Sequence, residues 1–159
     1  EHLASEGVPF EVVPGITSAI AGPGTAGIPV THRDYTSSVS FVTGHEDPTK
    51  DESAVEWDAL AATGGTIVVL MGVGKLPDYT PALREAGMDP ETPVALVERA
   101  TWPEMRVASG TLADIVDVRD EAGIEPPAIT VIGEVAATRE RVVEFLRNRT
   151  GGESGVTDA

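Results

Sequence analysis

The sequence predicts an α/β domain built on a mixed sheet flanked by helices. Short segments rich in Val, Ile and Thr alternate with segments of helical pattern, which is the order typical of a sheet covered by helices. The segment 66–71 (TIVVLM) is apolar throughout, as expected of a central strand buried on both faces. The segment 105–108 is a further short strand that can form a hairpin with a neighbour, which makes the sheet mixed.

The predicted strands are apolar or alternating runs. In chain order they are 8–15, 38–43, 66–71, 93–98, 105–108 and 128–132. The first, VPFEVVPG, closes with a Pro-Gly turn, and the second, SVSFVT, alternates small polar with apolar residues. A loop at 44–48 follows the second strand, and a glycine turn at 72–74 follows the third.

The predicted helices are bounded mainly by Gly, Pro and Thr. They cover 2–6, 18–27, 51–62, 76–86, 111–122 and 135–147. Pro77 lies in the first turn of the fourth helix, where its missing N–H leaves no hydrogen bond unmade, and Gly87 ends that helix. Thr111 is the predicted cap of the fifth helix, which ends by Gly123.

The helix 18–27 (SAIAGPGTAG) is unusual in composition. Thr17 and Ser18 stand at its start, where a hydroxyl can accept from the unpaired N–H groups of a first turn. Its Ala and Gly residues are too small to form an ordinary core face, and Pro23 removes one hydrogen bond. Such a helix lets another segment or a ligand approach its backbone closely.

The chain is strongly acidic, with 26 Asp and Glu against 11 Lys and Arg and a net charge of −15. Repulsion of phosphate therefore argues against nucleic acid as a partner. Adaptation to a very salty cytoplasm and an ordinary acidic bacterial protein both fit this composition. The absence of cysteine excludes disulfides and thiolate metal sites. No apolar run approaches the roughly 18 residues of a membrane span, so no membrane partner is expected.

The length of 159 residues suits one domain, which we place at 1–149. The polar segment 150–159 is predicted to be a disordered tail.

Several motifs carry a resemblance to a known family. PGITSAIAG, GIPVTHRDY and SVSFVTGHE come first, and TIVVLMGVGKLP, TPVALVERAT and PPAITVIGEV follow in order. Together they resemble the tetrapyrrole methylases, and within that family the enzymes that methylate uroporphyrinogen III. The resemblance runs from about 8 to 146, nearly the whole chain.

The resemblance implies methyl transfer from S-adenosylmethionine to C2 and C7 of uroporphyrinogen III, giving precorrin-2 for the sirohaem and cobalamin routes. The donor is an activated sulfonium and the acceptor an electron-rich pyrrole carbon, so holding the two in line supplies much of the rate. No metal is needed, and a base is needed only to collect a proton afterwards.

The resemblance also implies a set of cofactor-binding positions: Thr17, Ser18, Met71, Ala100 and Ala128. Thr17 and Ser18 follow the PGI turn, and Met71 ends the apolar strand. Ala100 and Ala128 match backbone contacts to the nucleoside. Judged from the residues alone, Thr17 is equally well a helix cap, and a methionine in the position of Met71 is more often a core residue than a ligand contact.

Arg33 is the residue expected to bind the tetrapyrrole, whose rim is rich in carboxylates. A guanidinium can bind a carboxylate bidentately, and the resemblance matches Arg33 to the family's substrate-binding arginine. A surface arginine paired with Asp34 is the alternative. His32 and Arg106 are weaker candidates for substrate binding, because His32 fits a plain loop residue equally well and the family usually has Gln-Arg where this chain has Met105-Arg106.

Other ionisable residues are expected to have no catalytic role. His45 is predicted to be structural, and Glu98 and Glu134 are predicted to lie on solvated faces.

Enzymes of this family have two domains with the clefts between them, and the glycine-rich motifs of the N-terminal half do not occur in this sequence. We therefore expect the chain to be the C-terminal domain of the two-domain fold, inactive alone and partnered by the missing N-terminal half. A cytoplasmic homodimer is the expected assembly. Two alternatives stay open: another precorrin or diphthine methyltransferase, against which GIPVTHRDY argues, and a non-catalytic dimerisation fragment.

Overall fold

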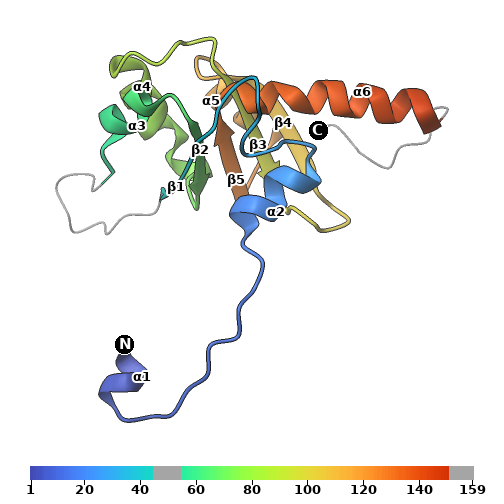
Figure 1. Cartoon of the computed structure of the whole chain (residues 1–159). Helices are drawn as coiled ribbons and strands as arrows, with labels where there is room; N and C mark the ends of the chain where they lie inside the picture. The colour runs from blue at the N-terminus through green and yellow to red at the C-terminus, as the bar shows by residue number, and fades with distance from the viewer. Residues whose placement is uncertain (45–54, 151–159) are drawn as a thin grey trace.

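The structure is a computed structural model that describes residues 1–44 and 55–150 (Figure 1). One sheet has the strand order β1-β2-β5-β3-β4. The strands are β1 Val39–Thr43, β2 Thr66–Leu70, β3 Pro93–Glu98, β4 Arg106–Thr111 and β5 Ala128–Ile132. The helices are α1 His2–Ser5, α2 Ser18–Thr25, α3 Trp57–Thr63, α4 Leu76–Glu85, α5 Ile115–Ala122 and α6 Thr138–Thr150, with 3₁₀ turns η1 Val73–Lys75 and η2 Glu134–Ala137. The predicted mixed α/β class is confirmed.

The strand directions decide which loops meet. β1 and β2 pair in parallel, whereas the pairs β2–β5, β5–β3 and β3–β4 are antiparallel. β1, β2 and β3 therefore run one way, and β4 and β5 run the other. We call the end of the sheet that contains Leu70 and Glu98 the carboxyl end. The end that contains Thr66 and Pro93 is the amino end.

Helices cover both faces of the sheet (Figure 1). α3, α4 and α5 pack on one apolar cluster, which includes Ile67 and Leu96, and α2 and η2 pack on the other, which includes Val68 and Val97. Successive residues of a strand point to opposite faces. The unbroken apolar run of β2 therefore supplies both clusters, which confirms the prediction that this strand is buried on both faces.

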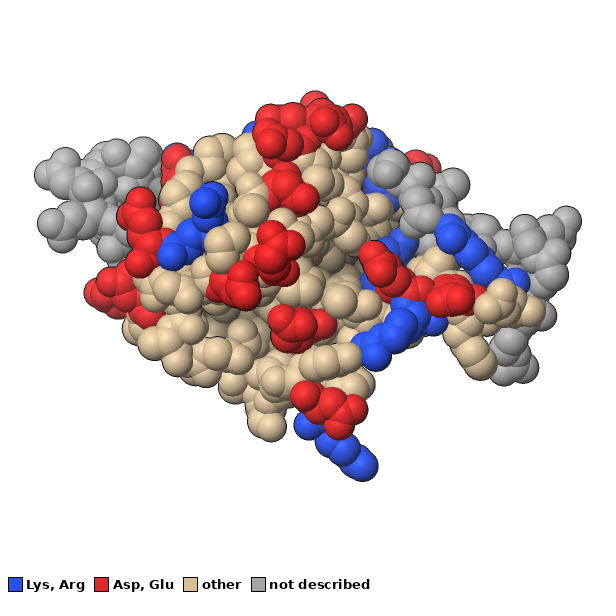
Figure 2. All heavy atoms as spheres, turned by 90° about the horizontal axis from the view of Figure 1, so that it is seen from above, with Lys and Arg blue, Asp and Glu red and all other residues tan. Residues whose placement is uncertain are grey.

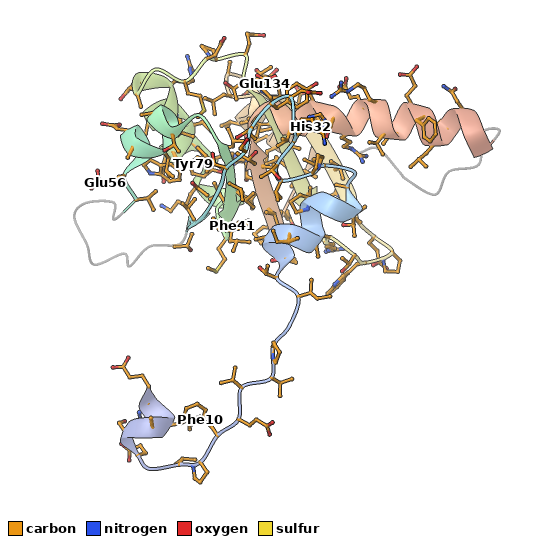
Figure 3. All side chains as sticks on the ribbon, in the orientation of Figure 1. Phe10, His32, Phe41, Glu56, Tyr79 and Glu134 are labelled. Carbon is orange, nitrogen blue, oxygen red and sulfur yellow. The ribbon has the colours of Figure 1, made fainter. Side chains whose placement is uncertain are left out.

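Tyr79 of α4 joins its helix to the sheet inside the first cluster (Figure 3). Its hydroxyl donates to Oγ1 of Thr130 at 3.0 Å, and its ring stacks on Trp57 with centroids 5.1 Å apart. Burial raises the pKa of Tyr79 well above its ordinary value. The hydroxyl thus stays protonated and acts as a structural donor.

The segment 8–15, predicted to be a strand, pairs with no strand in the described part of the chain. It runs as an extended arm away from the sheet, and Phe10 lies on it (Figures 1 and 3). Phe10, Val12 and Val13 are 57%, 78% and 81% exposed. An apolar pattern produces a strand only where a second strand is available to pair with it. The prediction of a strand here is therefore wrong for this structure.

Helix starts differ from the sequence prediction in two further places. Thr111 ends β4 and does not cap α5, because the helix begins only after Asp114, whose Oδ1 accepts from the Thr111 amide at 2.6 Å. The final helix begins at Thr138, after the 3₁₀ turn η2, and not at Val135.

Some predictions fall on residues that are not described. These are most of the loop 44–48, including His45, the start of the predicted helix 51–62, and nearly all of the tail 150–159. In the parts of the chain that are described, no helix has the length and apolar character that crossing a membrane requires.

Candidate active site

A cavity of about 1170 Å³ opens at the carboxyl end of the sheet. Its wall is formed by the first turn of α2, the end of β2 with η1, the end of β3 with its following loop, and the start of β5. Because β2 and β3 run in one direction and β5 in the other, these four segments meet at one end. We call this cavity the carboxyl-end pocket.

Two glycines allow the chain to turn sharply at the ends of β1 and β2. A Cβ atom on Gly44 would lie 2.4 Å from the Gly72 Cα, and one on Gly72 would lie 2.4 Å from Cγ1 of Val69. Neither distance leaves room for a side chain, so the two backbones can approach only because both residues are glycine. This close approach positions Met71 and η1 beside the pocket.

Residues with a strained backbone conformation cluster at this pocket. In the described chain the non-glycine residues with positive φ are Met71 at 54°, Arg99 at 47° and Thr101 at 71°. Met71 and Arg99 line the pocket, and Thr101 lies within the loop that forms its wall. Each left-handed residue of this kind costs of order 1–2 kcal/mol. Clustered strain of this kind is typical of ligand-binding sites.

The loop after β3 is attached to the segment before β5. The Arg99 amide donates to the Pro127 carbonyl at 2.9 Å, and the Trp102 amide donates to the Arg99 carbonyl at 3.0 Å. These hydrogen bonds hold Ala100 and Trp102 against the pocket wall that Ala128 begins. Backbone hydrogen bonds therefore help to position the loop, together with the packing of Ala100 against the second apolar cluster.

The small-residue helix α2 packs closely on β5, as its composition predicts. A Cβ atom on Gly22 would lie 2.3 Å from Cδ1 of Ile129, so a larger residue would push the helix away from the strand. Thr17 is the helix cap, with its Oγ1 accepting from the Ala19 amide at 3.2 Å. Ser18, the first helical residue, lines the pocket.

Glu98 and Arg106 form a partly buried ion pair beside the pocket. Glu98 is only 2% exposed, so the prediction of a solvated face is wrong for this residue. The Arg106 Nε donates to Oε2 of Glu98 at 2.6 Å, and Nη1 and Nη2 donate to the carbonyls of Ala122 and Gly123. All three guanidinium nitrogens are thus used within the fold, which gives Arg106 a structural position and not the expected substrate-binding one.

The sequence contains a signal for this pair. Glu98 ends an apolar strand, and Arg106 lies opposite it in the β3–β4 hairpin. Oppositely charged residues that face each other across a strand pair attract.

His32 and Arg33 lie at the amino end of the sheet, away from the pocket. His32 and Thr36 form a β-bridge, and the Arg141 Nη2 donates to the Tyr35 hydroxyl at 2.7 Å. Arg33 is exposed, and neither His32 (labelled in Figure 3) nor Arg33 lines the carboxyl-end pocket. Figure 2 looks onto this end, over which acidic side chains are widely spread.

The structure therefore divides the predicted site. Ser18, Met71, Ala100 and Ala128 line one pocket. His32 and Arg33 are separated from it by the length of the strands, about 16 Å for five residues. The expectation missed Lys75, Arg99 and Trp102, which also line the pocket. Lys75 could have been found, because lysines are rare in this sequence.

No group of three or more His, Asp or Glu side chains suited to holding a metal occurs among the described residues. The pocket walls consist mainly of apolar side chains, small residues and backbone. Such an arrangement can hold a flat heterocycle between apolar walls, with polar backbone groups at its rim.

Known proteins are similar to this chain in sequence and in fold. The family model for tetrapyrrole (corrin/porphyrin) methylases matches residues 1–116. An S-adenosyl-L-methionine-dependent uroporphyrinogen III methyltransferase of Methanosarcina barkeri is 53% identical over 151 residues, which is 95% of this chain and 58% of that protein. A uroporphyrinogen-III C-methyltransferase of Priestia megaterium is 44% identical over 85% of this chain and 56% of that protein.

Solved structures agree with these matches. Uroporphyrin-III C-methyl transferase from Thermus thermophilus, complexed with S-adenosyl homocysteine, superposes with a TM-score of 0.71 at 33% identity, over 85% of this chain and 57% of that one. A cobalt precorrin-4 methyltransferase superposes with a TM-score of 0.75 at 30% identity, over 85% of this chain and 56% of that one. The chain thus spans a little over half the length of these relatives. On the family match and these relatives together, the chain belongs to the tetrapyrrole methylase family.

Proposed function

We propose that this chain supplies the S-adenosyl-L-methionine site of a uroporphyrinogen III C-methyltransferase. One observation carries the proposal: Ser18, Met71, Ala100 and Ala128, expected at the cofactor from the resemblance, converge from four separate segments on one pocket. The names of the Methanosarcina and Priestia relatives and the S-adenosyl homocysteine in the Thermus structure support it.

The residues of the pocket suit an adenosine-containing ligand. Val97 and Ile129 give apolar walls for a purine, while Met71 and Arg99 hold backbone groups in a left-handed conformation at the rim. When bound, the donor supplies a sulfonium-activated methyl group. The role of this chain is to hold the donor in a fixed orientation so that an acceptor carbon can approach in line.

The finer features of the function are part of the same proposal. The acceptor is uroporphyrinogen III, methylated at C2 and C7 to precorrin-2, in a cytoplasmic homodimer. Turnover requires a further domain, because this chain covers only 56–58% of the length of its relatives. The isolated chain is expected to bind the donor but not to complete the reaction.

A second candidate is methylation of a later corrin precursor. It is favoured by the cobalt precorrin-4 methyltransferase, whose fold superposes with the TM-score of 0.75 given above. The two candidates share the donor pocket and differ only in the acceptor. Mass spectrometry of products from uroporphyrinogen III and from cobalt precorrin-4, with the N-terminal half supplied in trans, separates them.

The donor site is tested by filling it. A Cβ atom on Gly74, which lines the pocket, meets nothing within 4 Å, so Gly74→Phe adds a large side chain at the pocket wall where its Cβ has open space. Calorimetric titration with S-adenosyl homocysteine should show a loss of affinity of tenfold or more. The matched control is Gly24→Phe, because Gly24 also has open space around it but lies outside the pocket.

Two results would overturn the assignment. One is a wild-type chain that does not bind S-adenosyl homocysteine. The other is Gly74→Phe binding it as tightly as Gly24→Phe does.

A further inference from the structure

The wall of the carboxyl-end pocket carries positive charge, although the chain as a whole is strongly acidic. Of the described residues that line it, only Lys75 and Arg99 are charged, and both are cationic. The whole sequence has 26 acidic residues against 11 basic ones. Positive charge is therefore concentrated in a cavity of a molecule whose overall field repels anions.

The two cations stand on either side of the pocket floor. Lys75 ends η1, which follows β2, and Arg99 directly follows β3. β5 lies between these two strands in the sheet. The strands that precede the two cations are thus two strand spacings apart, about 10 Å. Side chains of this length can reach one ligand from both sides.

Neither cation is strongly engaged by an acidic residue in the described part of the chain. The Lys75 Nζ lies 3.1 Å from Oδ2 of Asp78, but both side chains are exposed, and pairs of that kind contribute little. The Arg99 Nε lies 4.0 Å from Oε1 of Glu98. The carboxylate of Glu98 is already held by the closer contacts of Arg106.

The backbone fixes Arg99 in an unfavourable conformation at this position. Its φ of 47° is strained for a residue with a side chain, and its amide is held by the Pro127 carbonyl. Glycine would relieve the strain, so the presence of arginine indicates that the side chain is used. A guanidinium binds a carboxylate through two parallel hydrogen bonds, and an ammonium group adds a point charge.

We propose that Lys75 and Arg99 form a carboxylate-binding pair at the carboxyl-end pocket. This inference rests on the proposed function, which supplies two sources of a carboxylate: the amino-acid part of the donor and the acidic side chains on the rim of the tetrapyrrole. It gives to Lys75 and Arg99 the role that the sequence assigned to Arg33.

The test compares ligands with and without carboxylates. The variants are Lys75→Gln and Arg99→Gln in the full chain, with Arg84→Gln as control, because Arg84 is an exposed cation on α4 outside the pocket. Affinities are measured by calorimetry for S-adenosyl homocysteine and for methylthioadenosine, which lacks the amino-acid part. Uroporphyrin III and its methyl ester form the second pair of ligands.

We expect each pocket variant to lose about tenfold in affinity for one carboxylate-bearing ligand, the size of one charge-assisted hydrogen bond. Its affinity for the matching ligand without carboxylates should stay within twofold. A loss confined to S-adenosyl homocysteine assigns the pair to the donor. A loss confined to uroporphyrin III assigns it to the acceptor. Arg84→Gln should bind all four ligands as the wild type does.

Three results overturn the carboxylate role. The first is wild-type affinity of the variants for both carboxylate-bearing ligands. The second is a loss of affinity for methylthioadenosine as large as that for S-adenosyl homocysteine, and the third is an equal loss of affinity in Arg84→Gln. Failure of the wild type to bind either adenosine compound is a different outcome, because it removes the proposed function itself. If the wild type binds the adenosine compounds but not uroporphyrin III, the comparison of S-adenosyl homocysteine with methylthioadenosine alone decides whether the pair binds a carboxylate.

Discussion

The two ends of the sheet handle left-handed backbone differently. At the amino end the described residues with positive φ are glycines, among them Gly64 after α3 and Gly133 after β5. At the carboxyl end Gly123 is also left-handed, but so are three residues with side chains, Met71, Arg99 and Thr101. Glycine adopts such a conformation without strain, whereas a residue with a side chain does not.

This difference indicates that the carboxyl end keeps side chains at left-handed positions at a cost in stability. The amino end encloses a cavity of about 170 Å³ between Tyr35 and the turn at Gly64 and Gly65, whereas the carboxyl-end pocket measures about 1170 Å³. Strain, space and positive charge coincide at the carboxyl end alone among the described residues. Substitutions at one end of the sheet can therefore be compared with matched control substitutions elsewhere in the chain.

The largest effect is expected from removing the partner of a buried charge at the carboxyl end. Arg106→Met leaves the buried Glu98 carboxylate with the 4.0 Å contact to Arg99 in place of its closest partner, and should lower the free energy of unfolding by about 3 kcal/mol. Urea denaturation measures it. At the amino end, Arg141→Met removes an exposed hydrogen bond to Tyr35 and the stacking of the guanidinium on its ring, and should cost less than about 1 kcal/mol. Equal losses for the two variants would contradict the comparison.

A smaller loss is expected where two backbones touch. In Gly44→Ala the new Cβ would lie 2.4 Å from the Gly72 Cα, and because that atom is backbone the strands must move apart. The expected loss in free energy of unfolding is about 2 kcal/mol. Gly74→Ala is the control, since its Cβ has open space, and should change stability by less than about 1 kcal/mol. Thermal unfolding of both variants tests this, and an unchanged Gly44→Ala would show that the close approach is not required.

The third prediction exchanges the backbone preferences of the two ends. Met71→Gly relieves a left-handed residue that is 66% exposed, and should raise the free energy of unfolding by about 0.5–1 kcal/mol. Gly64→Ala introduces the same strain at the amino end and should lower it by about 1 kcal/mol. Met71→Gly should also weaken S-adenosyl homocysteine binding several-fold, whereas Gly64→Ala should not. If Met71→Gly loses stability, the methionine is there for packing and not for the ligand.

The fold and the expected site follow from the sequence for different reasons. The runs TIVVL and PVALVE are unambiguous because strands buried on both faces need unbroken apolar sequence. The positions expected at the donor came from the family resemblance, and the structure brings four of them to one pocket. The arm 8–15 carries an equally apolar pattern, yet strand formation depends on a pairing partner that no local pattern encodes.

The other differences between expectation and structure concern charged residues. Glu98 and Arg106 were judged one at a time, although their roles depend on the hairpin register that places them opposite each other. Arg33 was placed at the substrate because the resemblance matches it to the family's substrate-binding arginine and because positive charge is scarce in the sequence. The scarcity of positive charge makes each cation notable. It does not show at which end of the sheet the loop that carries the cation lies. The same scarcity applies to Lys75, which does line the pocket.

The smallest effect is expected from Arg33→Ala at the amino end. Arg33 is exposed and lies on the loop that His32 and Thr36 close, so its loss should change the free energy of unfolding by less than about 0.5 kcal/mol. S-adenosyl homocysteine affinity should stay within twofold of wild type, in contrast to the Gly74→Phe variant. The affinity of Arg33→Ala for uroporphyrin III is the more decisive measurement. A tenfold loss there would mean that a tetrapyrrole reaches the amino end, and the carboxylate role of Arg33 would return beside that of Lys75 and Arg99. An unchanged affinity would leave the carboxyl end as the ligand-binding end of the sheet, with its strained backbone and its two cations serving the same bound molecule.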